Sequence, residues 1–200
     1  MNTASRRLRG SYQNIIECYN SASDRGFADG VRWYDEANSI SVSIGELAGY
    51  SGHKALFVGA GIISALSPQV EWGENIHYAM LLVKDGTRKH TQANHDKAVR
   101  IMNGERPLDV LGGRKVRAFY KAIVAPRGSG EPVIDRHAVA VYMKRSLTNK
   151  QLGYLRNRDV MDRVQGAYIK ASKILGVPHH QVQAVTWNEW RLRKGIVKSY

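Results

Sequence analysis

The 200-residue sequence predicts an all-α fold. Apolar residues recur at spacings of three and four in most segments, which is the period of a helix with one buried face. Segments in which apolar and polar residues alternate, as they do in a half-buried strand, are scarce. Apolar residues make up 43% of the chain, so the helices are expected to pack around a core.

In the first half of the chain, one helix is expected to be buried on all sides. It spans 53–66, where Ala55, Val58, Ile62 and Leu66 place apolar side chains around the whole circumference. Pro68 ends it. The other helices expected here have one apolar face, and they span Tyr12 to Asn20, Ala28 to Ser39, Ser43 to Tyr50, Glu74 to Val83 and Thr91 to Asn103.

In the second half, a brief turn at 107–110 and a tight bend at Gly112 and Gly113 precede a helix over 114–124. Later helices are expected over Arg136 to Lys144, Val160 to Leu175 and His179 to Trp190. Because no repeat of fixed period is present, we interpret residues 11–200 as a single helical globular unit that follows a flexible basic arm at 1–10.

Composition excludes several classes of protein. Cys18 is the single cysteine, which excludes an internal disulfide framework and any four-cysteine zinc or iron–sulfur site. No apolar run is long enough to span a membrane, and the basic start lacks the apolar centre of a secretory signal. We therefore expect a cytoplasmic protein with no membrane partner.

The positive charge of the chain is large and uneven. The formal net charge is +13, and residues 84–127 carry eleven basic against four acidic side chains. A surplus of this kind favours contact with a phosphate polyanion and so predicts a nucleic-acid partner. A surface charged only for solubility is the alternative.

Three short motifs carry candidate chemistry. Gly112 and Gly113 open a helix whose free amides and positive dipole end suit a phosphate, although a plain packing corner has the same pattern. Asp135 follows an apolar pair at a helix start, as either an N-cap or a functional carboxylate. Gln69 follows Pro68 in a polar corner, where a capped helix start is the alternative.

In order and local sequence, these motifs resemble the helix-hairpin-helix DNA glycosylases of the endonuclease III type. That family's "LLSAQ" corner, "LPGVGRK" hairpin and "VDTH" helix start correspond here to ALSPQ (65–69), VLGGRK (110–115) and IDRH (134–137). Leu111 and Val110 replace the first glycine and the proline of the hairpin, and the stretch between Gln69 and Lys115 is shorter than in the family. The resemblance covers about 59–145.

The resemblance implies a shortened glycosylase-like fold of two helical lobes sharing one core, with the N- and C-terminal helices in the second lobe. It implies that Lys115 is the nucleophile of a DNA glycosylase or glycosylase/AP lyase, that Asp135 is the essential carboxylate, and that Gln69 fills the gap left by an extruded base. No metal or cofactor is implied. The expected DNA-binding residues are Gln69, Gly112, Gly113, Arg114, Arg117, Lys121, Arg136 and His137.

The whole chain also looks like uncharacterised proteins of actinobacteria and their phages, which implies a bacterial host cell and no particular activity. Alternatives to a glycosylase are a non-catalytic DNA-binding protein, a phage enzyme of modified-thymine metabolism and a host-interaction protein. His90 and His95 are interpreted as surface or capping residues, and Trp187 and Trp190 as core residues. The sequence does not indicate an oligomeric state.

Overall fold

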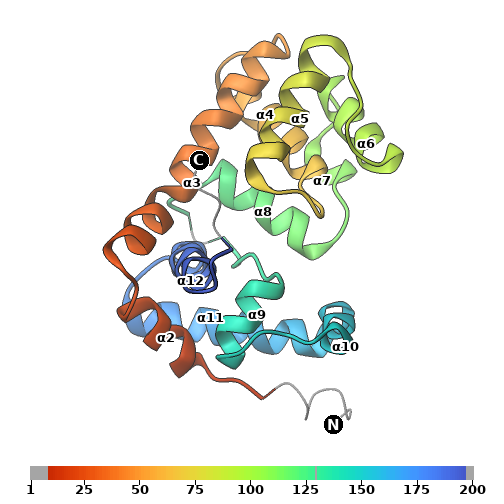
Figure 1. Cartoon of the computed structure of the whole chain (residues 1–200). Coiled ribbons are helices and arrows are strands. Elements are labelled where there is room, and N and C mark those ends of the chain that lie inside the picture. Colours follow the sequence, from red (N-terminus) through yellow and green to blue (C-terminus); the bar gives the residue numbers. More distant parts are fainter. Residues whose placement is uncertain (1–8, 129, 197–200) are drawn as a thin grey trace. The chain divides into compact units, whose positions relative to one another are not determined.

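The structure, a computed structural model, is built from helices. It describes residues 9–128 and 130–196, and these residues form helices, turns and connecting loops without any strand (Figure 1). The prediction of an all-α fold is confirmed. Residues 1–8 of the expected basic arm lie outside the described residues.

The chain divides into two compact units. Of the described residues, the terminal unit holds 9–33, 127–128 and 130–196, and the central unit holds Tyr34–Pro126. The helix α3 (Asp24–Leu47) begins in the terminal unit and ends in the central unit. The terminal unit also contains α2 (Tyr12–Asn20), α9 (Arg136–Met143), α10 (Asn149–Leu152), the 3-10 helix η1 (Gly153–Arg156), α11 (Arg158–Leu175) and α12 (His179–Arg193). The central unit also contains α4 (Gly52–Leu66), α5 (Trp72–Asp85), α6 (Gln92–Met102), α7 (Pro107–Val110) and α8 (Arg114–Val124).

In the central unit, α4 is the buried axis that the sequence predicts. Every residue from Val58 to Leu66 is buried, and α4 packs against α5, α6, α7 and α8. The end of α3 approaches α4 closely, because both helices have small residues where they cross. A Cβ atom at Gly45 would lie 1.9 Å from the Ala55 carbonyl oxygen, and one at Gly59 would lie 1.8 Å from that of Ser41. Only glycine permits these backbones to come so near.

The break expected between Ser39 and Ser43 is wrong, because α3 runs through it as one helix. The hydroxyls of Ser39, Ser41 and Ser43 donate to the carbonyl oxygens four residues earlier, at 3.1, 2.7 and 3.4 Å. Each serine thereby satisfies its hydroxyl within the helix instead of competing for the helix backbone. The sequence also did not predict α10 and η1.

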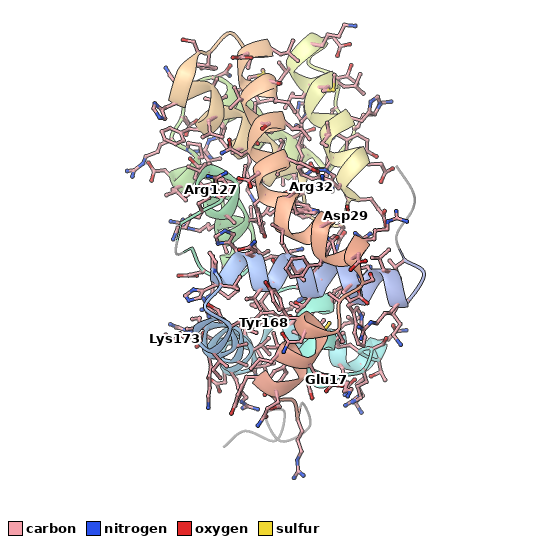
Figure 2. All side chains as sticks on the ribbon, turned by 90° about the vertical axis from the view of Figure 1, so that its left-hand side faces the viewer. Glu17, Asp29, Arg32, Arg127, Tyr168 and Lys173 are labelled. Atoms are coloured by element: carbon pink, nitrogen blue, oxygen red, sulfur yellow. The ribbon has the colours of Figure 1, made fainter. Side chains whose placement is uncertain are left out.

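In the terminal unit, α2, α9, α11 and α12 surround Tyr168, which is fully buried and labelled in Figure 2. The Tyr168 hydroxyl donates to the Ala138 carbonyl oxygen at 3.2 Å and lies 3.4 Å from the Thr186 hydroxyl. Burial raises the pKa of the nearby Cys18 thiol to about 11, so this cysteine stays protonated and unreactive.

A buried carboxylate ties α12 to the beginning of α3. Glu189 accepts hydrogen bonds from the Ser23 amide at 2.9 Å, the Ser23 hydroxyl at 2.7 Å and Arg193 Nε at 2.6 Å. Burial alone raises the pKa of Glu189, but these hydrogen bonds outweigh it and hold the pKa below its usual value. Within the described residues, no helix combines the length and the apolar character that a membrane span requires.

The substitution Gly59→Ala tests the crossing of α3 and α4. The added methyl group would overlap the Ser41 carbonyl, so the two helices must separate, and we expect a loss of about 2 kcal/mol in the free energy of unfolding. Urea denaturation followed by circular dichroism measures it. Gly166→Ala is the matched control: a Cβ there contacts nothing, and alanine should stabilise α11 by up to about 1 kcal/mol. Equal effects of the two substitutions would refute the tight crossing.

Candidate functional site

A glycine turn precedes α8 in the central unit. Leu111 is buried, whereas Gly112 and Gly113 are exposed. The φ angle of Gly113 is +75°, in the left-handed region that favours glycine. A Cβ atom at either glycine would meet no described atom within 4 Å. The first amides of α8 have no acceptor inside the helix, so a phosphate could approach them closely at this turn.

Arg117 stabilises the same turn. Its guanidinium donates to the carbonyl oxygen of Leu108 at 2.8 Å and to that of Leu111 at 3.4 Å. The side chain therefore reaches back from the first turn of α8 to the residues before the glycines, and it fixes the path of the chain between α7 and α8. The sequence predicts Arg117 as a DNA-binding residue and gives no sign of this second role.

Three further cations of α8 are exposed, namely Arg114, Lys115 and Lys121. The opposite face of α8 carries Ala118, Ala122 and Ile123, which are buried. At the end of the helix, the Ile123 carbonyl oxygen accepts a hydrogen bond of 2.8 Å from the Asn38 amide of α3. The helix is therefore fixed at both ends, and its cationic side chains point away from the core.

Gln69 occupies a strained turn directly after α4. Its φ angle is +65°, and within the described residues only Lys144 shares this left-handed conformation among residues other than glycine. The Val70 amide donates to the Ser67 carbonyl oxygen at 3.5 Å, which closes the turn with Pro68 and Gln69 at its tip. The conformation costs a residue with a side chain about 1–2 kcal/mol, and the Gln69 side chain is exposed.

His90, which follows α5 along the chain, holds this turn in place. Its Nε2 lies 2.9 Å from the Pro68 carbonyl oxygen, and its Nδ1 lies 2.6 Å from the Thr91 amide nitrogen. The amide must donate, so Nδ1 accepts and the proton is on Nε2, which donates to Pro68. The ring of Tyr78 packs against the imidazole, with the two ring centroids 6.5 Å apart. His90 thus accepts from the amide of Thr91, the N-cap residue of α6, and also positions the Gln69 turn.

An aromatic contact brings the Gln69 turn next to α8. Trp72, three residues after Gln69, packs edge to face against Phe119 with ring centroids 6.4 Å apart. Phe119 lies one helical turn after Lys115, on the same side of α8. The exposed turn is therefore connected, through Trp72, to the side of α8 that carries Lys115.

Asp135, in the terminal unit, is the N-cap of α9. Its Oδ1 accepts hydrogen bonds from the amides of His137 at 2.9 Å and Ala138 at 2.8 Å. Its Oδ2 accepts one from Trp187 Nε1 at 3.0 Å. Of the two roles that the sequence leaves open, the structure shows the cap and adds a tryptophan partner from α12.

Trp187 is itself held on several sides. The Arg191 guanidinium lies 4.2 Å from its ring centroid, and the rings of Trp33 and His137 meet it edge to face at 6.1 and 6.2 Å. Trp187 is half-buried, whereas Trp190 is buried in the core as predicted. Arg136 Nε donates to His137 Nε2 at 3.1 Å. The carboxylate of Asp135 therefore has a fixed orientation.

The predicted site residues divide between the two units. Asp135, Arg136 and His137 belong to the terminal unit. Sequence reasoning missed the roles of His90 and Trp187, because their partners lie 22 and 52 residues away along the chain. The other predicted residues belong to the central unit, and they are Gln69, Gly112, Gly113, Arg114, Lys115, Arg117 and Lys121.

A double-mutant cycle tests the bond between Asp135 and Trp187. Asp135→Ala removes the cap and the indole partner, and Trp187→Phe removes only the indole N–H. We expect the two losses in the free energy of unfolding to be non-additive by about 1–3 kcal/mol, as for a hydrogen bond to a charged acceptor. Urea denaturation of the four proteins measures this coupling. Strict additivity would mean that the indole does not stabilise the carboxylate.

The chain was compared with known proteins. No curated protein and no solved structure is significantly similar to it. Residues 1–194 match the model of one protein family, which therefore covers nearly the whole sequence. The chain belongs to the family of unknown function DUF7178.

Proposed function

We propose that this protein binds DNA and acts on it as a DNA glycosylase or a glycosylase/AP lyase. One observation carries the proposal: the strained, exposed Gln69 turn leads into Trp72, whose ring packs against Phe119, one helical turn after Lys115 on α8. The resemblance to helix-hairpin-helix glycosylases assigns to these residues the gap-filling glutamine and the nucleophilic lysine. Both residues belong to one unit, as such an assignment requires.

The surroundings of Lys115 suit a DNA backbone. The glycine turn leaves room for a phosphate at the amides of α8, and the cations of Arg114 and Lys121 lie on the same helix. Arg117 keeps the turn in its open form through the Leu108 and Leu111 carbonyls. Binding at this surface is therefore expected to weaken steeply with salt.

The strain at Gln69 supports a role for its side chain. Glycine would adopt the same conformation without cost, and proteins retain such strain mostly at functional positions. The hydrogen bond from His90 to the Pro68 carbonyl oxygen fixes the turn, so the side-chain amide of Gln69 extends from a rigid backbone. An extruded nucleotide leaves a gap in the base stack, and a rigid polar wedge would stabilise the opened duplex.

The chemistry assigned to Lys115 is attack by its neutral amine on C1′ of the sugar. The new C–N bond forms as the bond from C1′ to the base, or to the hydroxyl of an abasic site, breaks and the leaving group takes the electron pair and a proton. In the N-glycoside so formed, the bond between C1′ and the ring oxygen O4′ then breaks, O4′ takes the proton that the nitrogen loses, and the open sugar is left as an imine that borohydride reduces to a stable adduct. Asp135 is proposed to stabilise the positive charge that develops on the sugar, a role that suits a carboxylate of fixed orientation.

Substitutions of Lys115 separate chemistry from binding. We expect wild-type protein to form a borohydride-trapped adduct with duplexes that contain abasic or damaged sites. Lys115→Arg should keep DNA affinity within about threefold, because the charge remains, yet abolish the adduct, because a guanidinium does not deprotonate in proteins. Denaturing gels measure the adduct, and fluorescence anisotropy measures affinity. Lys84→Ala, which removes an exposed lysine from the end of α5, is the control that should change neither.

The lysine assignment fails if no adduct forms across a broad panel of lesions or if the adduct survives in Lys115→Arg. If wild-type protein shifts no DNA even at low salt, the DNA-binding part of the proposal fails as well.

Gln69→Gly tests the wedge. The substitution relieves the left-handed strain, so we expect the free energy of unfolding to rise by about 1 kcal/mol. Base extrusion should become weaker at the same time, because the side chain that fills the gap is lost. A 2-aminopurine base at the target position reports extrusion by its fluorescence. If the variant is more stable and gives the same 2-aminopurine fluorescence as the wild type, Gln69 is not a wedge.

A second candidate is a non-catalytic DNA-binding protein. It is favoured by Asp135, whose two oxygens already accept three hydrogen bonds from the protein, a pattern that a purely structural cap explains. This candidate predicts salt-sensitive DNA binding that Arg114→Ala and Lys121→Ala abolish, with no adduct at any lesion and no effect of Asp135→Asn on binding.

A further inference from the structure

The terminal unit carries most of the positive charge of the molecule. Its described residues include sixteen Lys and Arg against eight Asp and Glu, whereas the central unit has eleven against nine. Within the terminal unit, residues 136–158 contain six Lys and Arg and no acidic residue. Residues 144–157 of this stretch connect α9 to α11 through α10 and η1, and α10 lies at one edge of the unit (Figure 1).

Four cations of this stretch are exposed without an acidic partner among the described residues, namely Arg136 at the start of α9, which donates to the His137 ring, and Arg145, Lys150 and Arg156 close to α10. Arg145 donates to the neutral Gln151 side chain at 3.2 Å, and neither Lys150 nor Arg156 has an acidic partner within 4 Å among the described residues. Their neighbours differ. Lys144 pairs with Glu17 at 2.5 Å, and Arg158 lies 3.8 Å from Asp162. We call Arg145, Lys150 and Arg156 the α10 basic surface.

The backbone of the α10 basic surface is held in place. The Gln151 side chain accepts from the Thr148 amide at 3.1 Å and from Arg145, so the capping box of α10 also orients the Arg145 guanidinium. Exposed hydroxyl and amide side chains stand between the cations, namely those of Ser146, Thr148 and Asn149. Guanidinium, ammonium, hydroxyl and amide donors are the groups that bind the phosphates of DNA.

A lipid surface fits this stretch less well. Membrane-surface helices carry a broad apolar face opposite their cations. Here α10 and η1 have four residues each, and among the side chains of the stretch that the structure describes, Leu152 is the one large apolar residue that is exposed.

We propose that the α10 basic surface is a second DNA-binding surface, which contacts the phosphate backbone of duplex DNA without reading its sequence. The inference rests on the proposed function because it takes DNA as the ligand. It does not require the glycosylase reaction. It adds contacts that the turn before α8 does not supply, and it assigns a role to three cations that the glycosylase resemblance leaves without one.

The test is the salt dependence of affinity for a 30-base-pair duplex that contains no lesion. The triple variant Arg145→Gln, Lys150→Gln and Arg156→Gln should reduce the slope of log affinity against log salt by about 2 to 3, since each lost phosphate contact removes about 0.9. At 0.1 M salt, the affinity should fall on the order of 100-fold. All three side chains are exposed, so circular dichroism and the thermal midpoint should match those of the wild type.

A control variant with three other substitutions removes the same amount of charge from the terminal unit. Arg25→Gln, Arg32→Gln and Lys173→Gln lie outside the stretch, and Asp29 already pairs with Arg25 and Arg32 at 3.7 and 3.6 Å (Figure 2). This control should reduce the slope by less than 1. An equal decrease of the slope in the two triple variants would show that only the net charge of the protein matters, and it would overturn the inference.

Other outcomes separate this inference from the proposed function. If the wild type forms the borohydride adduct and the α10 triple keeps the wild-type slope, the inference fails and the proposed function stands. If the triple loses the slope while the wild type forms no adduct at any lesion, the inference stands and the glycosylase assignment fails. Tighter binding to anionic phosphatidylserine vesicles or to duplex RNA than to DNA, lost in the α10 triple, would overturn the inference.

Discussion

The central unit depends on how closely α3 and α4 cross. Gly45 and Gly59 bring the two backbones so near that a methyl group at either position would overlap a carbonyl of the other helix. This contact makes one side of α4 inaccessible, and α5, α6, α7 and α8 cover the others. The Gln69 turn follows directly from the end of α4, so the crossing fixes where that turn emerges. The same packing fixes α8.

Gly113 and Gln69 both have left-handed backbone in this unit, and they solve the steric problem differently. Gly113 has no side chain to strain, and its turn stays open to a ligand. Gln69 retains its side chain and is held by other elements, through the bond from His90 to Pro68 and through Trp72 against Phe119. Glycine would serve if only the turn mattered, and this is why we propose a role for the side chain of Gln69.

The sequence predicts what depends on local pattern. The apolar circumference of α4 and the cap at Asp135 were both readable, since each depends on residues within one helix. The continuity of α3 was not, because Ser39 and Ser43 resemble a break until their hydroxyls are seen to bond inside the helix. The indole of Trp187 beside Asp135 was not readable either. Its position depends on the packing of α12 against α9, which no local spacing encodes.

Charge shows the same limit in a different form. A window along the sequence places the positive surplus at 84–127, yet folding combines this stretch with the acidic residues of 34–83, and the central unit is nearly neutral. Attraction of a polyanion to that unit must therefore come from the local grouping of Arg114, Lys115 and Lys121 on α8, within about one Debye length. In the terminal unit, most of the surplus lies in residues 136–158, which contain six Lys and Arg and no acidic residue. The net charge of the chain thus contains two different contributions, and only the first is tied to candidate chemistry.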